Sequence, residues 1–384
     1  MTDTDILPQT LCEFLSQTGA QIQFYDIGRR VVEITHDDML AIEHQQRPYP
    51  QPFLRHAWLG VLFHYDDDNN DAEAKPASDS HQIWFLKFPL DEQGLLSQDA
   101  RNDFLRRIIE TLAEQTLAQH NARLAATAGD SAKPTAPDMP EDNPHGFTPR
   151  DDRMASFHAK IARKLGLGSS QYYSHAADYF TGRTGFEQWN FVGLQGIADV
   201  AARLDEGDNL NTLIKAIPQL PITPFAALCS CLENEAIAPP LSAALRLRLA
   251  HDLQHDEAVA ATGVAAALRG LSHGQDQQAL DDALRATLCS TPASDIGRHV
   301  EVLATIAGRA WHRLEQADIA RAFLLNLARC DAGQTAFDNI MADLMFIPGL
   351  RKPLLDALRR LREDNECSSQ EAAIIDRFFQ SLQL

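Results

Sequence analysis

The hydrophobic pattern of the first 126 residues changes between the two-residue period of strands and the longer period of helices. Alternating apolar residues and runs rich in aromatic and β-branched residues predict four strands, near 22–24, 31–34, 57–65 and 82–88. Apolar residues at helical spacing predict three helices, one near residue 11, one over 37–46 and a long one that includes residue 104. Four strands with helices outside the strand run predict a small α+β domain over residues 1–126, with an antiparallel sheet.

From residue 148 to residue 384 the apolar residues keep a helical period, and we find no strand pattern. The segment 148–151 reads Thr-Pro-Arg-Asp, a strong helix start. Successive helices joined by short breaks are typical of an α-solenoid, and residues 256–269 resemble one helix of a HEAT-like repeat. Because no regular period emerges, the pattern predicts an all-helical domain that is either a helical repeat or an irregular bundle.

A proline-rich segment separates these two patterns. Residues 127–147 contain four prolines together with Gly, Ala, Ser and acidic residues, and Met139 is the one large apolar side chain between Thr127 and Gly146. Such a segment buries too little surface to offset its ordering entropy. We therefore predict a domain over 1–126, a flexible linker over 127–147 and a helical domain over 148–384.

The overall charge narrows the choice of partners. The chain has 53 acidic and 34 basic residues and a formal net charge of −19, which argues against nucleic acid and anionic membranes as partners. We find no secretory signal and no apolar run near the roughly 20 residues that span a membrane. The six cysteines are scattered, as reduced core thiols are. These features predict a soluble cytoplasmic protein without a cofactor.

One helical segment carries a candidate metal site. His251 and His255 share a helix face at the spacing that zinc ligands use, and Asp252 stands where metalloproteases have a glutamate. This spacing supports a metal-dependent hydrolase as an alternative function, although a solvated helix end explains it as well. Cys229 and Cys231 lie two apart in a predicted helix, so we expect buried core thiols there rather than further ligands.

A second candidate is a surface for binding another protein. The densest aromatic region of the helical domain follows its strongest cluster of basic residues, and aromatic side chains are common anchors at interfaces. We expect three aromatic anchors with a basic rim in the helical domain, and four charged contacts in the first domain: Tyr172, Tyr173, Trp189, Arg153, Arg163, Lys164, Arg29, Arg30, Asp91 and Glu92. These residues favour a non-enzymatic adaptor that binds two partners. A third hypothesis is an RNA- or ribosome-associated factor that uses the basic helix over 150–164.

Several longer segments together resemble a family of gamma-proteobacterial proteins that is classed as a domain of unknown function. They are the stretches 25–30, 84–96, 143–158, 193–199 and 231–237, which read in part YDIGRR, WFLKFPLDEQGLL, GLQGIAD and CLENEAI. The resemblance covers almost the whole chain in order, and it implies a bacterial cytosolic protein. It implies no activity, cofactor or catalytic residue.

Overall fold

The chain divides into two compact units, an N-terminal unit over residues 1–149 and a C-terminal unit over residues 150–384. The computed structural model describes residues 9–17, 19–64, 81–125, 139, 142–255, 258–289, 295–363 and 367–382. Residues 127–138, 140 and 141 of the predicted linker lie outside the described residues, so its flexibility stays a prediction.

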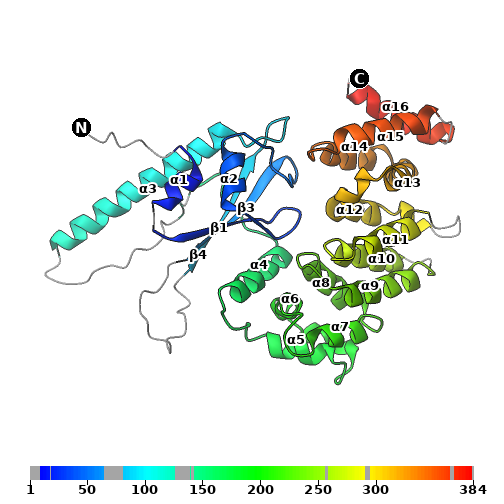
Figure 1. Ribbon diagram of the computed structural model, residues 1–384, viewed down its shortest axis with the longest axis horizontal. Coiled ribbons are helices and arrows are strands. Elements are labelled where there is room, and N and C mark those ends of the chain that lie inside the picture. The colour runs from blue at the N-terminus through cyan, green and yellow to red at the C-terminus, as the bar shows by residue number, and fades with distance from the viewer. Residues whose placement is uncertain are drawn as a thin grey trace. The chain divides into compact units, whose positions relative to one another are not determined.

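The N-terminal unit is built on a four-stranded antiparallel sheet with the strand order β2-β1-β3-β4. Its elements are α1 Leu11–Ser16, β1 Gln21–Asp26, β2 Val32–Ile34, α2 His36–Glu43, β3 His56–His64, β4 His81–Pro89 and α3 Gln98–Ala125 (Figure 1). The predicted α+β class and its four strands are confirmed. Strands β3 and β4 come from the segments 57–65 and 82–88, and they bury Val61, Phe63, Trp84 and Phe88, in agreement with the aromatic and β-branched pattern of these segments.

Helices cover one face of this sheet. Trp84 and Phe88 point to the same face of β4, and their rings lie 5.9 and 5.7 Å from the ring of Phe104 in α3. On β1, Phe24 contacts His36 at the start of α2, with ring centroids 6.5 Å apart. Edge-to-face aromatic contacts of this kind stabilise a core beyond the area they bury. The core of the N-terminal unit therefore lies between the sheet and these helices.

The last residues of the predicted linker belong to the N-terminal unit instead. The backbone N–H of Lys87 donates to the carbonyl of His145 at 2.7 Å, and the N–H of Phe147 donates to the carbonyl of Phe85 at 3.2 Å. The ring of Phe147 also stands edge-on to Trp58, 4.7 Å away. These residues extend the sheet at the outer edge of β4, which composition alone did not indicate.

The described residues of the C-terminal unit are helical and form no strand, which confirms the all-helical prediction. The α-helices are α4 Asp151–Lys164, α5 Tyr173–Phe180, α6 Leu194–Ala202, α7 Asn209–Ala216, α8 Ile222–Leu232, α9 Pro239–Asp252, α10 Ala258–Leu271, α11 Gln277–Leu288, α12 Val300–Arg309, α13 Ala317–Ala328, α14 Gly333–Leu344, α15 Arg351–Glu363 and α16 Ser369–Ser381. Short 3-10 helices occur at η1 Phe186–Phe191, η2 Asp295–Arg298 and η3 Trp311–Glu315.

Helices two apart in the sequence pack on one another in two rows. In the even row, which runs from α4 to α16, each helix contacts the next even-numbered helix. In the odd row, which runs from α5 to α15, each helix contacts the next odd-numbered helix (Figure 1). Buried apolar residues form one cluster along the whole unit, from Ala155 in α4 to Phe378 in α16. The apolar stripe of each helix is therefore buried against its neighbours in both rows.

Small residues allow the closest helix contacts. A Cβ atom at Gly196 in α6 would lie 2.4 Å from the carbonyl oxygen of Tyr172, just before α5. A Cβ atom at Gly263 in α10 would lie 2.3 Å from the carboxylate of Asp252 in α9. Another residue at position 196 would therefore push against the backbone before α5, and one at position 263 would displace the Asp252 side chain.

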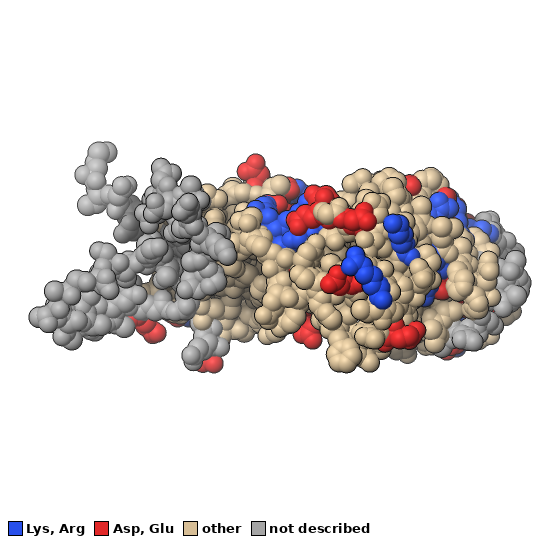
Figure 2. All heavy atoms as spheres, turned by 90° about the horizontal axis from the view of Figure 1, so that it is seen from below, with Lys and Arg blue, Asp and Glu red and all other residues tan. Residues whose placement is uncertain are grey.

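The surface carries charges of both signs. On the face seen in Figure 2, Lys and Arg side chains lie beside Asp and Glu side chains, with uncharged surface between these groups. Within the described ranges, no helix combines the length and the apolar character that crossing a bilayer requires.

Candidate functional site in the even row of helices

A fully buried carboxylate, that of Glu233 at the end of α8, connects four helices of the even row. Arg153 of α4 donates from Nη2 to its Oε1 at 2.7 Å, and Arg269 of α10 donates from Nη2 to the same oxygen at 2.9 Å. Arg309 of α12 donates from Nε to Oε2 at 2.9 Å, and Nε of Arg269 also contacts Oε2. We call Glu233 and these three arginines the arginine cluster.

The arginine cluster keeps its carboxylate ionised. Burial alone would raise the pKa of Glu233, but the charges of Arg153, Arg309 and Arg269 outweigh burial and hold that pKa below its ordinary value. Hydrogen bonds to charged groups are stronger than neutral ones, and here each carboxylate oxygen accepts at least two. Glu233 is therefore a fixed negative charge that holds α4, α8, α10 and α12 together.

The segment after α8 contributes further contacts to this cluster. Asn234 accepts a hydrogen bond from Nη1 of Arg153 at 2.8 Å, and its backbone carbonyl accepts one from Nζ of Lys160 at 2.7 Å. Lys160 also pairs with Glu235, at 3.2 Å. Arg153, which the sequence analysis places on an exposed rim, is instead 6% exposed and binds within the protein. Its charge is used to hold the C-terminal end of α8.

An open depression of about 540 Å³ lies beside the arginine cluster. It is lined by residues from α4, α6, α8 and α10 and from the residue before α4: Arg150, Asp151, Asp152, Leu194, Ala226, Ala227, Ser230 and Arg269. Oδ2 of Asp152 accepts from Arg150 at 3.1 Å and from Arg269 at 2.9 Å. Burial opposes ionisation of Asp152, yet Arg269 and the other arginines lower its pKa. The depression therefore has two guanidiniums in its wall and a partly apolar lining.

Two exposed aromatic residues are close in space or in sequence to Gly193, the residue before Leu194 of the depression. Tyr172 is 50% exposed and Phe191 is 76% exposed. The Tyr172 ring lies 3.7 Å from where a Cβ atom of Gly193 would be, and Leu194, the next residue, lines the depression. Phe191 stands two residues before Gly193. Exposed aromatic residues are common at protein-binding surfaces.

The other two predicted anchors face the interior. Tyr173 is half-buried, and its hydroxyl oxygen accepts from Nδ2 of Asn209 at 3.0 Å. Trp189 is also half-buried and packs against the hydrophobic core. The sequence analysis does not single out Phe191, because helical spacing gives no signal for its exposure.

The two other predicted rim residues lie at the C-terminal end of α4. Arg163 donates from Nη2 to Asp205 at 2.6 Å and from Nη1 to the carbonyl of Ala202. Lys164 is exposed. Arg163 is therefore held by the end of α6 and the loop that follows it, and Lys164 stands at the surface.

In the N-terminal unit, the predicted arginines are buried. Arg29 is 0% exposed and Arg30 is 7% exposed. Nε of Arg29 donates to the carbonyl of Pro52 at 2.7 Å, and its guanidinium lies 5.7 Å from the Phe53 ring centre. Arg29 therefore holds the proline-rich segment that follows α2, and neither arginine stands free at the surface as a partner contact would.

The predicted acidic contacts in this unit lie in an exposed turn after β4. Oδ1 of Asp91 accepts from the backbone N–H groups of Gln93 and Leu95 at 2.8 and 2.9 Å. Glu92 is exposed. Asp91 therefore shapes the turn, as aspartate commonly does, and Glu92 points to solvent within it.

The candidate metal residues lie at the C-terminal end of α9. The rings of His251 and His255 are 4.6 Å apart, but Nδ1 of His255 contacts the backbone carbonyl of His251 at 2.9 Å. The carboxylate of Asp252 is 3.0 Å from Nε of Arg248, which lies across the ring of Phe225. In the ranges that the structure describes, no three His, Cys, Asp or Glu side chains are grouped to hold a metal ion. Asp252 therefore acts here in packing α9 against α8.

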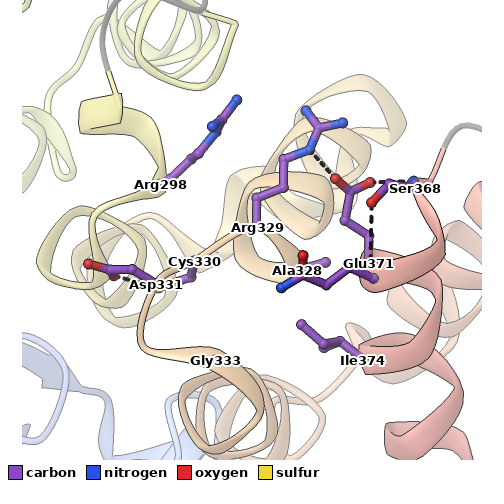
Figure 3. A pocket seen from close by; sticks show the side chains of 10 residues that line it. Arg298, Ala328, Arg329, Cys330, Asp331, Gly333, Ser368, Glu371 and Ile374 are labelled. Carbon is purple, nitrogen blue, oxygen red and sulfur yellow. Dashed lines mark hydrogen bonds and ion pairs between the residues drawn. The ribbon is translucent and has the colours of Figure 1, made fainter.

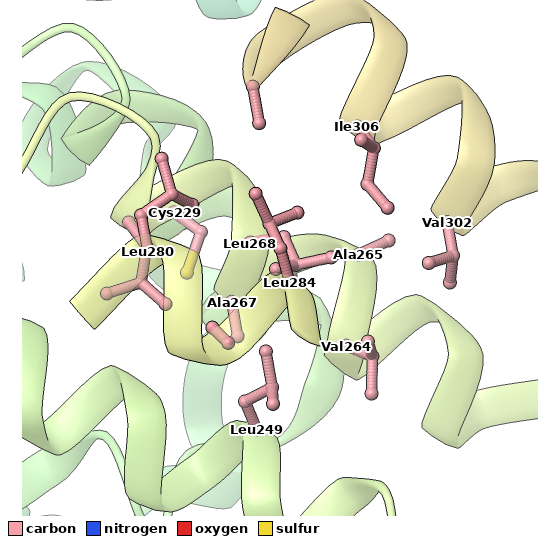
Figure 4. Packing of buried hydrophobic residues seen from close by; sticks show 14 of the residues in the cluster. Cys229, Leu249, Val264, Ala265, Ala267, Leu268, Leu280, Leu284, Val302 and Ile306 are labelled. Carbon is pink, nitrogen blue, oxygen red and sulfur yellow. The ribbon is translucent and has the colours of Figure 1, made fainter. Parts of the chain in front are cut away.

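The two neighbouring cysteines are core residues. Both Cys229 and Cys231 are buried in α8, and Cys229 belongs to the hydrophobic cluster drawn in Figure 4. Burial raises the pKa of Cys229 well above the ordinary value and that of Cys231 to about 12. Neither thiol is a reactive thiolate at neutral pH.

A second hollow, of about 570 Å³, lies between the end of α13 and the start of α16 (Figure 3). Its two arginines are already paired: Arg329 with Glu371 at 2.8 Å, and Arg298 with Asp295 at 2.9 Å. Glu371 also completes a capping box with Ser368. The Arg329–Glu371 pair and the capping box hold the start of α16, whereas the Arg298–Asp295 pair lies within η2.

Comparison with known proteins places the chain in a family but not among characterised relatives. No curated protein and no solved structure matches the chain. A family model described as a protein of unknown function (DUF3549) matches residues 8–374, which include the described parts of the sheet, the arginine cluster and the depression. The chain therefore belongs to the DUF3549 family of proteins of unknown function.

Proposed function

We propose that this protein is a non-enzymatic, cytoplasmic adaptor whose helical unit binds a protein partner through the even row of helices. The observations that support this proposal are the two exposed aromatic residues, Tyr172 and Phe191, and an open depression that has arginines in its wall and is lined by Leu194, three residues after Phe191. Aromatic and arginine side chains contribute most of the binding energy at many interfaces. Stacked helices in two rows are also the arrangement of α-solenoids, whose long surfaces bind proteins.

The arrangement of charges supports binding rather than catalysis. In the described residues of the even row, the buried carboxylate and guanidiniums of the arginine cluster are paired with one another. The His251, Asp252 and His255 side chains are likewise held by contacts of α9, so we find no specific observation in favour of the hydrolase alternative.

A site-specific crosslinking experiment tests this proposal. A photoreactive phenylalanine analogue replaces Phe191 in the full chain, and the matched control carries it in place of Leu247 of α9, which is 71% exposed. We expect a discrete crosslinked protein from position 191 and none of the same mass from position 247. Equal products from both positions, or no product from position 191, would contradict the proposal.

A further inference from the structure

The guanidiniums in the wall of the depression have N–H groups that donate no hydrogen bond within the described residues. Arg150 has a side chain that is 77% exposed, and among the described residues Asp152 is the acceptor that it contacts, through Nη2. Arg269 uses Nε and Nη2 for Glu233 and Asp152, and its Nη1 has no acceptor in the described part of the chain. Two arginines therefore present unused N–H groups at one place.

The balance of charge around the depression is positive. Four guanidiniums lie near two carboxylates, those of Asp152 and Glu233. The guanidiniums belong to Arg150 and Arg269 in the lining and to Arg153 and Arg309 of the arginine cluster. Asp151, at the edge of the depression, reduces this excess without cancelling it. An added carboxylate is therefore attracted here, and an added ammonium group is repelled.

The remaining lining is apolar and made of small side chains. Leu194, Ala226 and Ala227 are half-buried in the lining, and the alanines leave room above α8 for an incoming side chain. Apolar surface next to guanidiniums matches a ligand that carries both an acid and an aliphatic group. A peptide with alternating acidic and aliphatic residues meets this requirement.

We infer that the depression binds an acidic segment of the protein partner, with a carboxylate between Arg150 and Arg269 and an aliphatic side chain over Ala226 and Ala227. This inference rests on the proposed function and names the chemistry of the partner segment. The arginine cluster prepares the site, because Glu233 already fixes Arg269 in place and so reduces the entropy lost on binding.

The probe is a fluorescein-labelled synthetic peptide of alternating Glu and Leu residues, measured by fluorescence anisotropy with the full-length protein. Two reference peptides carry Gln or Lys in place of every Glu. We expect the Glu peptide to bind more tightly than the Gln peptide, the Lys peptide not to bind, and the affinity to fall at higher salt.

Two variants are expected to change the peptide affinity in opposite directions, and a third serves as the control. Arg150→Gln is expected to weaken binding of the Glu peptide about three- to fivefold, the range for an exposed charge pair. Asp151→Asn removes a repelling carboxylate and is expected to strengthen binding about twofold. The matched control is Arg246→Gln on α9, whose side chain is 45% exposed and pairs with Asp282 at 3.3 Å; it is expected to leave affinity unchanged.

The outcomes separate the inference from the proposed function. Equal binding of the Glu and Gln peptides, or equal effects of Arg150→Gln and Arg246→Gln, would overturn the acidic-segment inference. If the Glu and Gln peptides bound equally and Phe191→Ser abolished the binding of both, the adaptor proposal would still stand. If none of the peptides binds, the inference is wrong, and the crosslinking experiment at position 191 decides the adaptor proposal separately.

Discussion

Replacing Glu233 by Gln tests the physical account of the arginine cluster most directly. The substitution keeps the shape of the side chain and removes its charge, so the buried Arg153 and the partly buried Arg269 and Arg309 are left around a neutral amide. The amide also presents an N–H₂ group where a carboxylate oxygen accepts hydrogen bonds, so donors face donors. We therefore expect a large loss of stability without any change in packed volume.

The size of the effect follows from burial. The Glu233 side chain has no exposed surface and the Arg153 side chain is only 7% exposed, so water cannot replace the partner that Arg153 loses. Removing one member of a buried ion pair typically costs about 3–5 kcal/mol. The matched control is Glu206→Gln, where the carboxylate is 51% exposed and 3.6 Å from Arg203, and such a pair contributes about 1 kcal/mol or less.

The assay is denaturant unfolding of the full chain followed by far-UV circular dichroism, which reports mainly on the helices of the C-terminal unit. A companion variant, Glu233→Gln with Arg309→Gln, removes one of the uncompensated positive charges. We expect the double variant to be more stable than the sum of the two single changes predicts. If Glu233→Gln destabilised the protein no more than Glu206→Gln, the arginine cluster would not hold the helices together and the reasoning would be wrong.

The same carboxylate gives a pH dependence with a definite sign. The pKa of Glu233 is lowered in the folded protein, because its arginines outweigh burial, so the unfolded chain binds more protons at this position. Its stabilisation is therefore present above the ordinary glutamate pKa of about 4.3 and is lost as the pH falls through the lower folded value. Glu233→Gln should flatten the acid limb of a plot of unfolding free energy against pH, and an unchanged limb would contradict this assignment.

Two further predictions concern the packing of the helical unit. Gly196→Ala should destabilise the protein by about 1–3 kcal/mol, because the new methyl group meets the backbone before α5, whereas Gly308→Ala in α12, with nothing within 4 Å, should be neutral or stabilising in the same denaturant assay. In native protein at pH 8, a thiol reagent should label the exposed Cys289 quickly and Cys229 and Cys231 only after unfolding; fast labelling of the latter two would show that the α8 core opens.

The fold was predictable from the sequence where an element depends on residues close to one another in the chain. Alternation over 82–88 and helical spacing after residue 148 each depend on neighbours a few residues away, and both agree with the structure. The end of the predicted linker was not predictable in this way. His145 and Phe147 join the sheet by pairing with β4, more than 50 residues earlier, and no composition reveals a partner at that distance.

The sequence indicated which types of residue form the candidate site, but not where these residues lie in the folded protein. Charged residues are exposed by default, so Arg29, Arg30 and Arg153 were placed at the surface, yet each has partners inside its unit. The partner of Arg153 is Glu233, eighty positions later in the chain, and Glu233 is also the partner of Arg269 and Arg309. Tertiary packing of four helices brings them together, which a single sequence does not encode locally.

The buried charges and the exposed surface depend on each other. Arg269 belongs to both, because Glu233 fixes its Nε and Nη2 while the same side chain lines the depression. A guanidinium that is already held loses little rotamer freedom when a ligand arrives, so a partly exposed arginine can bind more strongly than a free surface arginine. Loosening Arg269 through Glu233→Gln should therefore weaken binding of the acidic peptide even under conditions in which the protein remains folded. A folded Glu233→Gln protein with unchanged peptide affinity would show that the arginine cluster supports the fold alone.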